Sequence, residues 1–529
     1  MSAPLHGLNF VASTLRRSGR TFVVSSPAGS SQLEGKFNLA RPIDCDEAIA
    51  AAEAAAGPFA RTTGAQRGAF LERVAEEILA LGDALIERAA AETALPVARL
   101  TGERGRTVGQ LRLFAAAARD GSWVDARIDR ALPDRQPLPR PDLRRMKLPL
   151  GPVAVFGSSN FPLAFSVAGG DTASALCTGN PVIVKAHRGH PGTSELVAGA
   201  IRRAVDACGV PPGVFSMLHG EGSVIGVQLV KDPRVKAVGF TGSRAGGRAL
   251  LAAAAARPDP IPVFAEMSSC NPVFVLPGAL AARSAAIAEG FRNSMTLGVG
   301  QFCTKPGILV AVEGPDLARF RGELAAAVAG AQPAPMLTAE ILREFDAHRD
   351  GLLGVSGVRV LARADTAADA GHSQAAAIVA ETDTETFLLQ PQCLEEVFGP
   401  CSLLVAVQNL VELRTVARRL DGQLTATIHG TESDLEEAAD LFELLAERAG
   451  RLVINGYPTG VEVCHAMQHG GPSPATSDSR FTSVGSAALE RFIRPVCLQD
   501  VPDRFLPPAL QDANPLGLER IVEGVRGRH

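Results

Sequence analysis

From Pro152 onward, strand-like and helix-like segments alternate along the chain, and this alternation constrains the fold more than any other feature of the sequence. Short apolar runs with the composition of buried strands occur at 153–156, 182–185, 214–218 and 235–240. Helical patterns at 165–178 and 193–208 separate the first three of these runs. Parallel strands need crossover connections of this kind, so we expect a parallel sheet with helices on both faces.

Further regions flank this sheet in the sequence. Apolar side chains at helical spacing predict three helices before it, at 44–56, 62–93 and 96–118. Residues 122–130 and 143–150 have the pattern of two strands of a hairpin. After Pro262, a second set of strand candidates continues to about residue 465. A chain of 529 residues has room for about three folding units of this kind.

The charge balance argues against nucleic acid and membrane partners. The chain has 52 Lys and Arg against 56 Asp and Glu, a net charge of −4. The connection at 130–145 is rich in Pro and Arg, so a nucleic-acid-binding arm is one reading of it. We interpret it instead as a long hairpin loop with solvated charges. The uncharged stretch 153–170 is too polar to span a bilayer.

Cysteine usage indicates a reducing compartment. The nine cysteines are scattered, their number is odd, and none forms a C-x-x-C pair. A disulfide framework and a thiolate zinc site are therefore not expected. The N-terminus lacks the compact apolar run of a secretory signal. We expect a cytoplasmic protein.

Three side chains are candidates for catalysis, and each also has a structural interpretation. Cys303, in G-Q-F-C, is either a nucleophile or a packed core thiol. Glu266, in an apolar stretch, is either a general base with a raised pKa or an exposed carboxylate at a strand end. Asn160 follows the first strand of the alternating region, where its amide could stabilise an oxyanion or form a turn.

Two glycine-containing turns are candidates for phosphate binding, although the G-x-G-x-x-G fingerprint is absent. Gly242 and Ser243 end a strand-like run and precede a helical one, so backbone N–H groups and a hydroxyl could hold a phosphate there. A plain strand-to-helix turn is the alternative. The run 220–226 lacks the fingerprint spacing, and Glu221 would repel phosphate. We interpret it as an ordinary turn into a helix.

Six segments, in order along nearly the whole chain, resemble motifs of the aldehyde dehydrogenase superfamily. They are S-N-F-P at 159–162, V-I-V-K at 182–185, F-T-G-S at 240–243, A-E-M-S-S at 265–269, G-Q-F-C at 300–303 and E-V-F-G-P at 396–400. Each is modest evidence alone, but their joint occurrence in this order is specific.

The resemblance implies an α/β fold with three parts. A Rossmann-type cofactor-binding domain would take residues 1–121 and 151–265, and an α/β catalytic domain residues 266–470. A β-arm for oligomerisation would combine residues 122–150 with 489–498. Exposed strand edges in such an arm need a partner, so we expect a homodimer or homotetramer.

The resemblance also implies a cofactor site. Lys185 would bind the adenosine ribose, Gly242 and Ser243 the pyrophosphate, and Glu396 the nicotinamide ribose, with Phe398 beside the ring. Arg188 stands where NAD-preferring relatives commonly have Glu, so it would attract a 2′-phosphate. We therefore expect NADP as the cofactor, with NAD as a weaker one.

Departures from the general pattern resemble one branch of the superfamily. Ser159 replaces the usual aromatic residue before Asn160, and M-S-S at 267–269 replaces L-G-G. These features, with H-G-G-P at 469–472, resemble α-ketoglutaric semialdehyde dehydrogenases, which implies 2,5-dioxopentanoate as the substrate. NADP-dependent oxidation of fatty aldehydes is the alternative. Arg292 and Arg480 are both candidates for binding the substrate carboxylate.

Other classes are weaker interpretations. A non-catalytic relative would be expected to lack Cys303, Glu266 or Asn160, and all three are present. Transfer of the acyl group to coenzyme A is possible from the same thioester, but Glu266 favours water. Cys464, His465 and His469 are close in sequence but have no standard zinc spacing, so we expect no metal.

Overall fold

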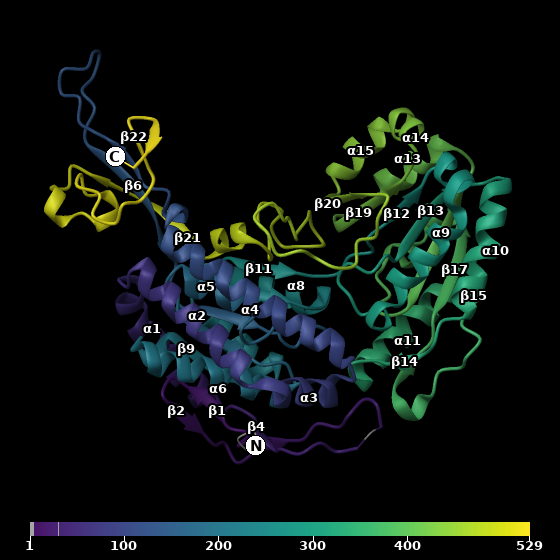
Figure 1. Cartoon of the computed structure of the whole chain (residues 1–529), viewed down its shortest axis with the longest axis horizontal. Helices are drawn as coiled ribbons and strands as arrows, with labels where there is room; N and C mark the ends of the chain where they lie inside the picture. The colour runs from purple at the N-terminus through teal and green to yellow at the C-terminus, as the bar shows by residue number, and fades with distance from the viewer. Residues whose placement is uncertain (1–4, 30, 529) are drawn as a thin grey trace.

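The computed structural model describes residues 5–29 and 31–528 and confirms the α/β class. Residues 1–4 and 30 of the expected cofactor-binding unit lie outside the described residues. Two seven-stranded sheets, each covered by helices, form the two halves of the molecule, and a five-stranded sheet projects from the first half (Figure 1).

The first sheet is built mainly from short, fully buried strands. In spatial order they are β11 (Val263–Glu266), β10 (Ala237–Thr241), β7 (Val153–Phe156), β8 (Val182–Lys185), β9 (Phe215–Leu218), β1 (Asn9–Val11) and β2 (Thr14–Arg16). The first five strands are parallel to one another. Strand β1 runs antiparallel to β9, and β2 runs antiparallel to β1. Apolar runs without alternation are what a sheet covered on both faces requires.

Helices surround this sheet. They are α1 (Pro42–Ala60), α2 (Gly64–Ala80), α3 (Gly82–Thr93), α4 (Val97–Asp120), α5 (Gly170–Cys177), α6 (Pro191–Cys208), α7 (Val227–Lys231) and α8 (Arg244–Ala255). The single helix expected at 62–93 is divided, because Gly82 is left-handed at φ 58°. The helix expected from 165 begins only at Gly170, since the preceding residues form compact turns.

The second sheet has the same construction. Its strands in spatial order are β15 (Arg359–Arg363), β17 (Ile378–Asp383), β18 (Cys401–Val407), β13 (Ile308–Val312), β12 (Val273–Val275), β19 (Gln423–His429) and β20 (Ala449–Ile454). All neighbours are parallel except β15 and β17. The associated helices are α9 (Pro277–Thr296), α10 (Pro315–Ala329), α11 (Ala339–Leu353), α12 (Thr384–Leu389), α13 (Leu410–Arg419), α14 (Glu432–Glu437) and α15 (Ala439–Ala446).

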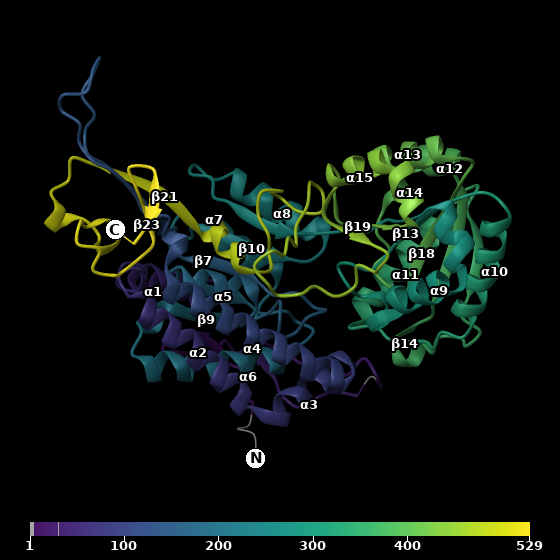
Figure 2. The same cartoon turned by 45° about the horizontal axis from the view of Figure 1, so that its top comes forward.

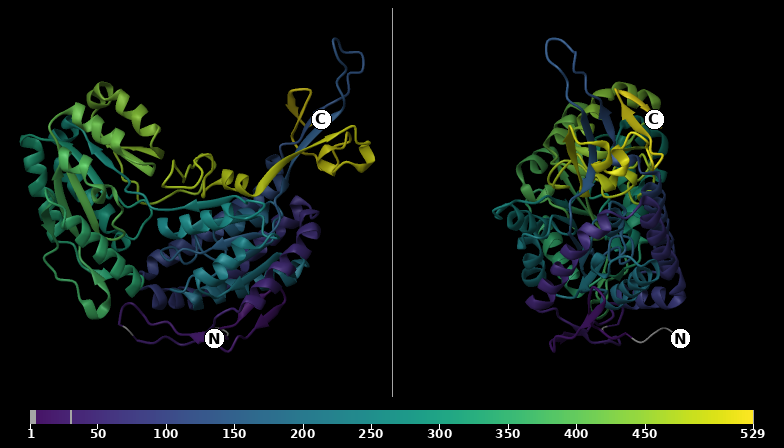
Figure 3. Two further views of the ribbon diagram at one scale, coloured as in Figure 1. Left: turned by 180° about the vertical axis from the view of Figure 1, so that it is seen from behind. Right: turned by 90° about the vertical axis from the view of Figure 1, so that its left-hand side faces the viewer.

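The projecting sheet joins strands from residues 127–149 to strands from the C-terminal residues 493–527 (Figure 3). Its order is β21 (Ile493–Gln499), β6 (Leu143–Pro149), β5 (Arg127–Asp129), β22 (Arg520–Val522) and β23 (Val525–Gly527). The strand expected at 122–130 shrinks to three residues, because Gly121 and Asp125 are left-handed. Sequence reasoning missed β22 and β23, whose three-residue lengths leave little periodic signal.

Beyond β20, the chain leaves the second half and runs back along the first, as the yellow-green and yellow ribbon of Figure 2 shows. It is fixed to α5 by a buried ion pair, in which Arg491 Nη1 lies 2.6 Å from Asp171 Oδ1. Both side chains are at most 9% exposed. Removing one partner of such a pair leaves an uncompensated buried charge.

Two global features complete the description. No helix within the described residues is long and apolar enough to cross a membrane. All nine cysteines are free thiols.

The buried pair generates a stability prediction. Asp171→Ala should lower the free energy of unfolding by about 3–5 kcal/mol, because Arg491 would stay buried without its carboxylate. Urea denaturation followed by circular dichroism measures this change. Asp206→Ala is the matched control, since Asp206 is 61% exposed and its pair with Arg202 spans 3.8 Å; it should change stability by less than about 1 kcal/mol. Equal effects of the two substitutions would contradict the role given to Asp171.

Candidate active site

The carboxyl ends of parallel strands bring several candidate residues to one edge of the first sheet. Strand register places Lys185 beside Phe156, and Thr241 beside Glu266. Asn160 follows β7 at the same edge. Ligands of open parallel sheets bind at this edge, so the strand order itself assembles the site.

A left-handed turn carries Cys303 from the second half to this edge. After α9, residues Gly298, Val299 and Gly300 have φ of 56°, 59° and 67°. Val299 is strained there, because a β-branched residue disfavours positive φ. A Cβ at Gly300 would lie 2.3 Å from the carbonyl oxygen of Gly399, so the turn needs glycine at this position.

Hydrogen bonds fix Asn160 beside the cysteine loop. Its side-chain Nδ2 donates to the carbonyl oxygen of Gln301 at 3.0 Å, two residues before Cys303. Arg99 donates to the Asn160 carbonyl oxygen at 2.6 Å, and the Asn271 amide donates to the Cys303 carbonyl oxygen at 2.9 Å. An amide carries two N–H donors, so Asn160 keeps one with no hydrogen-bond partner within the described residues.

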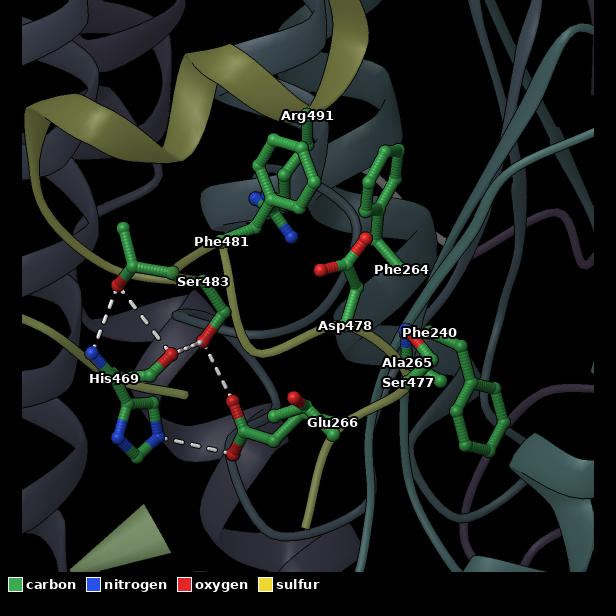
Figure 4. A pocket seen from close by; sticks show the side chains of 12 residues that line it. Phe240, Phe264, Ala265, Glu266, His469, Ser477, Asp478, Phe481, Ser483 and Arg491 are labelled. Atoms are coloured by element: carbon green, nitrogen blue, oxygen red, sulfur yellow. Dashed lines mark hydrogen bonds and ion pairs between the residues drawn. The ribbon is translucent and has the colours of Figure 1, made fainter. Parts of the chain in front are cut away.

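The nucleophile candidate and the base candidate meet at a histidine. Nε2 of His469 lies 3.5 Å from Sγ of Cys303 and 3.0 Å from Oε1 of Glu266. Ser483 Oγ donates to the other carboxylate oxygen of Glu266 at 2.6 Å. Figure 4 shows the contacts of His469 and Ser483 with the Glu266 carboxylate. The side chains of His469 and Glu266 are almost fully buried.

These contacts correct the expected pKa of Glu266. Burial alone would raise the pKa of this carboxyl, but His469 and the hydroxyl of Ser483 outweigh burial and lower it. Burial raises the pKa of the Cys303 thiol well above its usual range, and the Glu266 carboxylate raises it further. The expectation of a raised pKa at Glu266 was therefore wrong. These opposite shifts favour an ionised carboxylate beside a protonated thiol.

A small cavity adjoins Glu266. Its volume of about 20 Å³ is enough for one water molecule. Glu266, His469, Thr476 and Ser483 line it, with aromatic rings of Phe264 and Phe481 farther from the carboxylate (Figure 4). The carboxylate is therefore placed beside both the thiol and a space suited to a reacting water.

The predicted 2′-phosphate pair lies at the end of β8. Burial, together with the neighbouring charge of Arg188, lowers the pKa of Lys185 to about 8. Arg188 is exposed, with its guanidinium carbon 5.3 Å from the centre of the Phe22 ring. Two cations held next to each other are suited to an anionic ligand.

The predicted pyrophosphate turn opens α8. Ser243 is the N-cap of this helix, its hydroxyl accepting from the Gly246 N–H at 3.2 Å, and Gly242 and Ser243 are exposed. A Cβ at Gly242 would lie 2.7 Å from the Phe240 ring. The exposed N-terminus of a helix at this sheet edge fits a phosphate group.

The predicted nicotinamide-ribose residues lie between the sheets. Glu396 contacts Ser268 and Ser269, next to Glu266, and burial raises the pKa of Glu396 to about 7 despite the nearby Lys305. Phe398 is half-buried two residues further along. The Glu396 carboxylate is thus a hydrogen-bond acceptor that contacts residues 268–269 and lies near enough to Cys303 for its charge to act on the thiol.

Sequence reasoning missed the role of His469 and Ser483. The stretch H-G-G-P at 469–472, which departs from the general family pattern, was the available signal for His469. Sequence reasoning grouped His469 with Cys464 and His465 instead, but His465 bonds to Ser486. Within the described residues, possible metal-ligating atoms of Glu266, Cys303 and His469 lie within 4.8 Å of one another.

Neither arginine suggested for a substrate carboxylate is supported by its contacts. Arg480 is 80% exposed and paired with Asp478. Arg292 is paired with Glu289 on its own helix, and its buried Nε has no hydrogen-bond partner within the described residues. A different arginine, Arg106, has buried guanidinium nitrogens near the site.

Comparison with known proteins agrees with this arrangement. The aldehyde dehydrogenase family matches residues 14–494, and the chain belongs to this family. It is 56% identical over 488 residues to alpha-ketoglutaric semialdehyde dehydrogenase 2 of Azospirillum brasilense, covering 92% of this chain and 93% of that protein. It is 49% identical over 490 residues to alpha-ketoglutaric semialdehyde dehydrogenase of Acinetobacter baylyi, covering 92% of each.

Solved structures share the fold. The aldehyde dehydrogenase KauB from Pseudomonas aeruginosa superposes with a TM-score of 0.78 at 21% identity, covering 94% of this chain and 97% of that one. An aldehyde dehydrogenase is an oxidoreductase, so the enzyme class expected from the motifs is confirmed.

The electrostatics of the site generate a prediction. Glu266→Gln should lower the pKa of Cys303, because it removes the negative charge that opposes formation of the thiolate. Alkylation of Cys303 by iodoacetamide, followed by peptide mass spectrometry, should then reach half its maximal rate at lower pH than in the wild type. Cys303→Ala identifies the alkylation due to this residue. An unchanged or higher midpoint would show that Glu266 does not control the thiol.

Proposed function

We propose that the protein oxidises 2,5-dioxopentanoate (α-ketoglutaric semialdehyde) to 2-oxoglutarate with NADP, through a thioester on Cys303. The single observation that carries the proposal is the contact of one His469 nitrogen with both Cys303 and Glu266, at 3.5 and 3.0 Å. This contact places a base within hydrogen-bond range of the nucleophile. The two relatives that share about half of their residues with this chain support the substrate.

Addition of the aldehyde begins at the thiol. As Cys303 Sγ bonds to the aldehyde carbon, its proton passes to Glu266 and from there to solvent, so the carboxylate is ionised again when the thioester has formed. The resulting oxyanion accepts hydrogen bonds from the free N–H of the Asn160 amide and the backbone N–H of Cys303. One donor of this kind contributes about 3 kcal/mol to stabilising a transition state. Two-electron oxidation of this adduct to the thioester is the chemistry that a nicotinamide cofactor supplies when bound.

Hydrolysis of the thioester needs a base and a water. Glu266 is ionised and borders the cavity with room for one water molecule. It removes a proton as the water attacks the acyl carbon, and the Cys303 thiol is regenerated. Ser483 and His469 keep the carboxylate oriented, so water is favoured over coenzyme A as the acyl acceptor.

Local charge supports the choice of cofactor. Lys185 and Arg188 would bind the 2′-phosphate of NADP, and the turn at Gly242 and Ser243 its pyrophosphate. Glu396 would accept hydrogen bonds from the nicotinamide ribose, and Phe398 would buttress the ring.

The remaining features support a cytoplasmic homodimer or homotetramer. Nine free thiols suit a reducing compartment. Strand β21 is the outermost strand of the projecting sheet, and an unpaired strand edge of this kind suits pairing with a second copy.

A substitution at the nucleophile tests the reaction. Cys303→Ala should abolish aldehyde-dependent reduction of NADP, because no thiohemiacetal can form, while NADP binding measured by calorimetry persists. Assaying the wild type with 2,5-dioxopentanoate, pentanal and octanal under both cofactors tests the substrate. A higher kcat/KM for octanal would favour the fatty aldehyde alternative. Turnover retained by Cys303→Ala would refute the mechanism.

Reversing the charge at residue 188 tests cofactor preference. Arg188→Glu should lower kcat/KM for NADP by about 10- to 100-fold and spare NAD, since a carboxylate repels the 2′-phosphate and can accept from a 2′-hydroxyl. Arg418→Glu, on an exposed face of the other half, is the matched control and should change neither value. A wild-type preference for NAD would overturn the role of Arg188.

A further inference from the structure

One face of α4 carries charged side chains towards the loop that contains Asn160. Arg99, Glu103 and Arg106 lie at positions i, i+4 and i+7, which share a helix face. Arg99 donates to the Asn160 carbonyl oxygen, and Glu103 Oε1 accepts from the backbone N–H groups of Leu163 and Ala164 at 2.8 and 3.0 Å. Two of the three side chains are therefore used to hold this loop.

The third charged side chain, Arg106, makes no hydrogen bond to this loop within the described residues. Nε and Nη2 of Arg106 are buried and have no hydrogen-bond partner within the described residues. Aromatic rings surround the guanidinium instead, with its carbon 5.6 Å from the centre of Phe161 and 5.1 Å from that of Phe165. Ring faces attract a cation but leave its N–H donors unsatisfied. A buried charge with unmet donors is suited to a ligand that brings acceptors.

The same rings border the catalytic groups. Phe161 packs against Phe302, with ring centres 5.3 Å apart, and Phe302 immediately precedes Cys303. The ring of Phe165 lies 6.2 Å from that of His469. The charge of Arg106 also favours the Cys303 thiolate, opposing the effects of burial and of Glu266 on its pKa. The cation and the nucleophile thus adjoin one cluster of aromatic side chains.

Other arginines near the thiol are already engaged. Arg99 is bonded to the Asn160 loop. Arg451 donates to the carbonyl oxygens of Pro458 and Gly460, at 2.5 and 3.1 Å. Arg99 Nη1 and Arg451 Nε are also buried without a hydrogen-bond partner, but Arg106 is the one of these three arginines that leaves two such nitrogens within the described residues.

We propose that Arg106 binds the carboxylate of the substrate and so selects aldehydes with an acidic far end over neutral aldehydes. A planar guanidinium matches a carboxylate through paired N–H donors, and apolar walls suit the short carbon chain between acid and aldehyde. The proposal rests on the proposed function to the extent that the aldehyde reacts at Cys303.

A pair of substrates that differ only in the acid tests this directly. Kinetics of Arg106→Gln are compared for 5-oxopentanoate and pentanal, which have the same chain length. We expect kcat/KM for 5-oxopentanoate to fall about 100-fold, mainly through KM, and that for pentanal to change less than about threefold. Arg112→Gln, an exposed arginine of the same helix, is the matched control and should leave both unchanged. Equal losses for both substrates, or no loss for either, would overturn the proposal.

Alkylation provides a readout without turnover. Iodoacetate carries a carboxylate and iodoacetamide does not, so the ratio of their rates at Cys303 reports the attraction of an acid to the site. Arg106→Gln and Arg106→Met should each lower this ratio about tenfold, and an unchanged ratio would contradict the proposal. If the wild type oxidises 5-oxopentanoate but not 2,5-dioxopentanoate, the proposed substrate fails while the role of Arg106 stands.

Discussion

The contact of His469 with both Cys303 and Glu266 is the interaction on which the rest of the site depends. It joins the end of β11, the turn after α9 and the C-terminal segment that returns across the first half. That segment is held by an isolated antiparallel bridge between Glu266 and Thr476 and by a hydrogen bond from the Met267 N–H to the Ala475 carbonyl oxygen. The histidine therefore reaches the site with little freedom.

The pairing of a low-pKa carboxylate with a high-pKa thiol has a chemical consequence. Two anions this close in a buried site would repel each other strongly, so one proton is retained between them. The proton leaves the thiol when the sulfur gains an electrophile, and the carboxylate is then beside the acyl group that it must help to hydrolyse. Burial and hydrogen bonding thus keep the Cys303 thiol protonated until an aldehyde is present.

Helix α4 provides the second constraint. Its row of charged residues fixes the Asn160 loop through Arg99 and Glu103, which places the oxyanion donor opposite the thiol. The same row places Arg106 against the aromatic rings of Phe161 and Phe165 near Cys303. A helix far upstream in the sequence therefore shapes the environment of the nucleophile, and no local pattern around residue 106 indicates this.

By itself, the sequence determined the α/β class and the strands that end at the site, because apolar runs and turn residues act locally. The same local signals predicted Cys303, Glu266 and Asn160 as candidates through their motifs. Tertiary structure alone decided the state of Glu266, since its pKa depends on His469 and Ser483, more than 200 residues away. It also decided which arginine stands near the thiol. Charge, burial and hydrogen bonding act through space, so they become readable only when distant segments have been brought together.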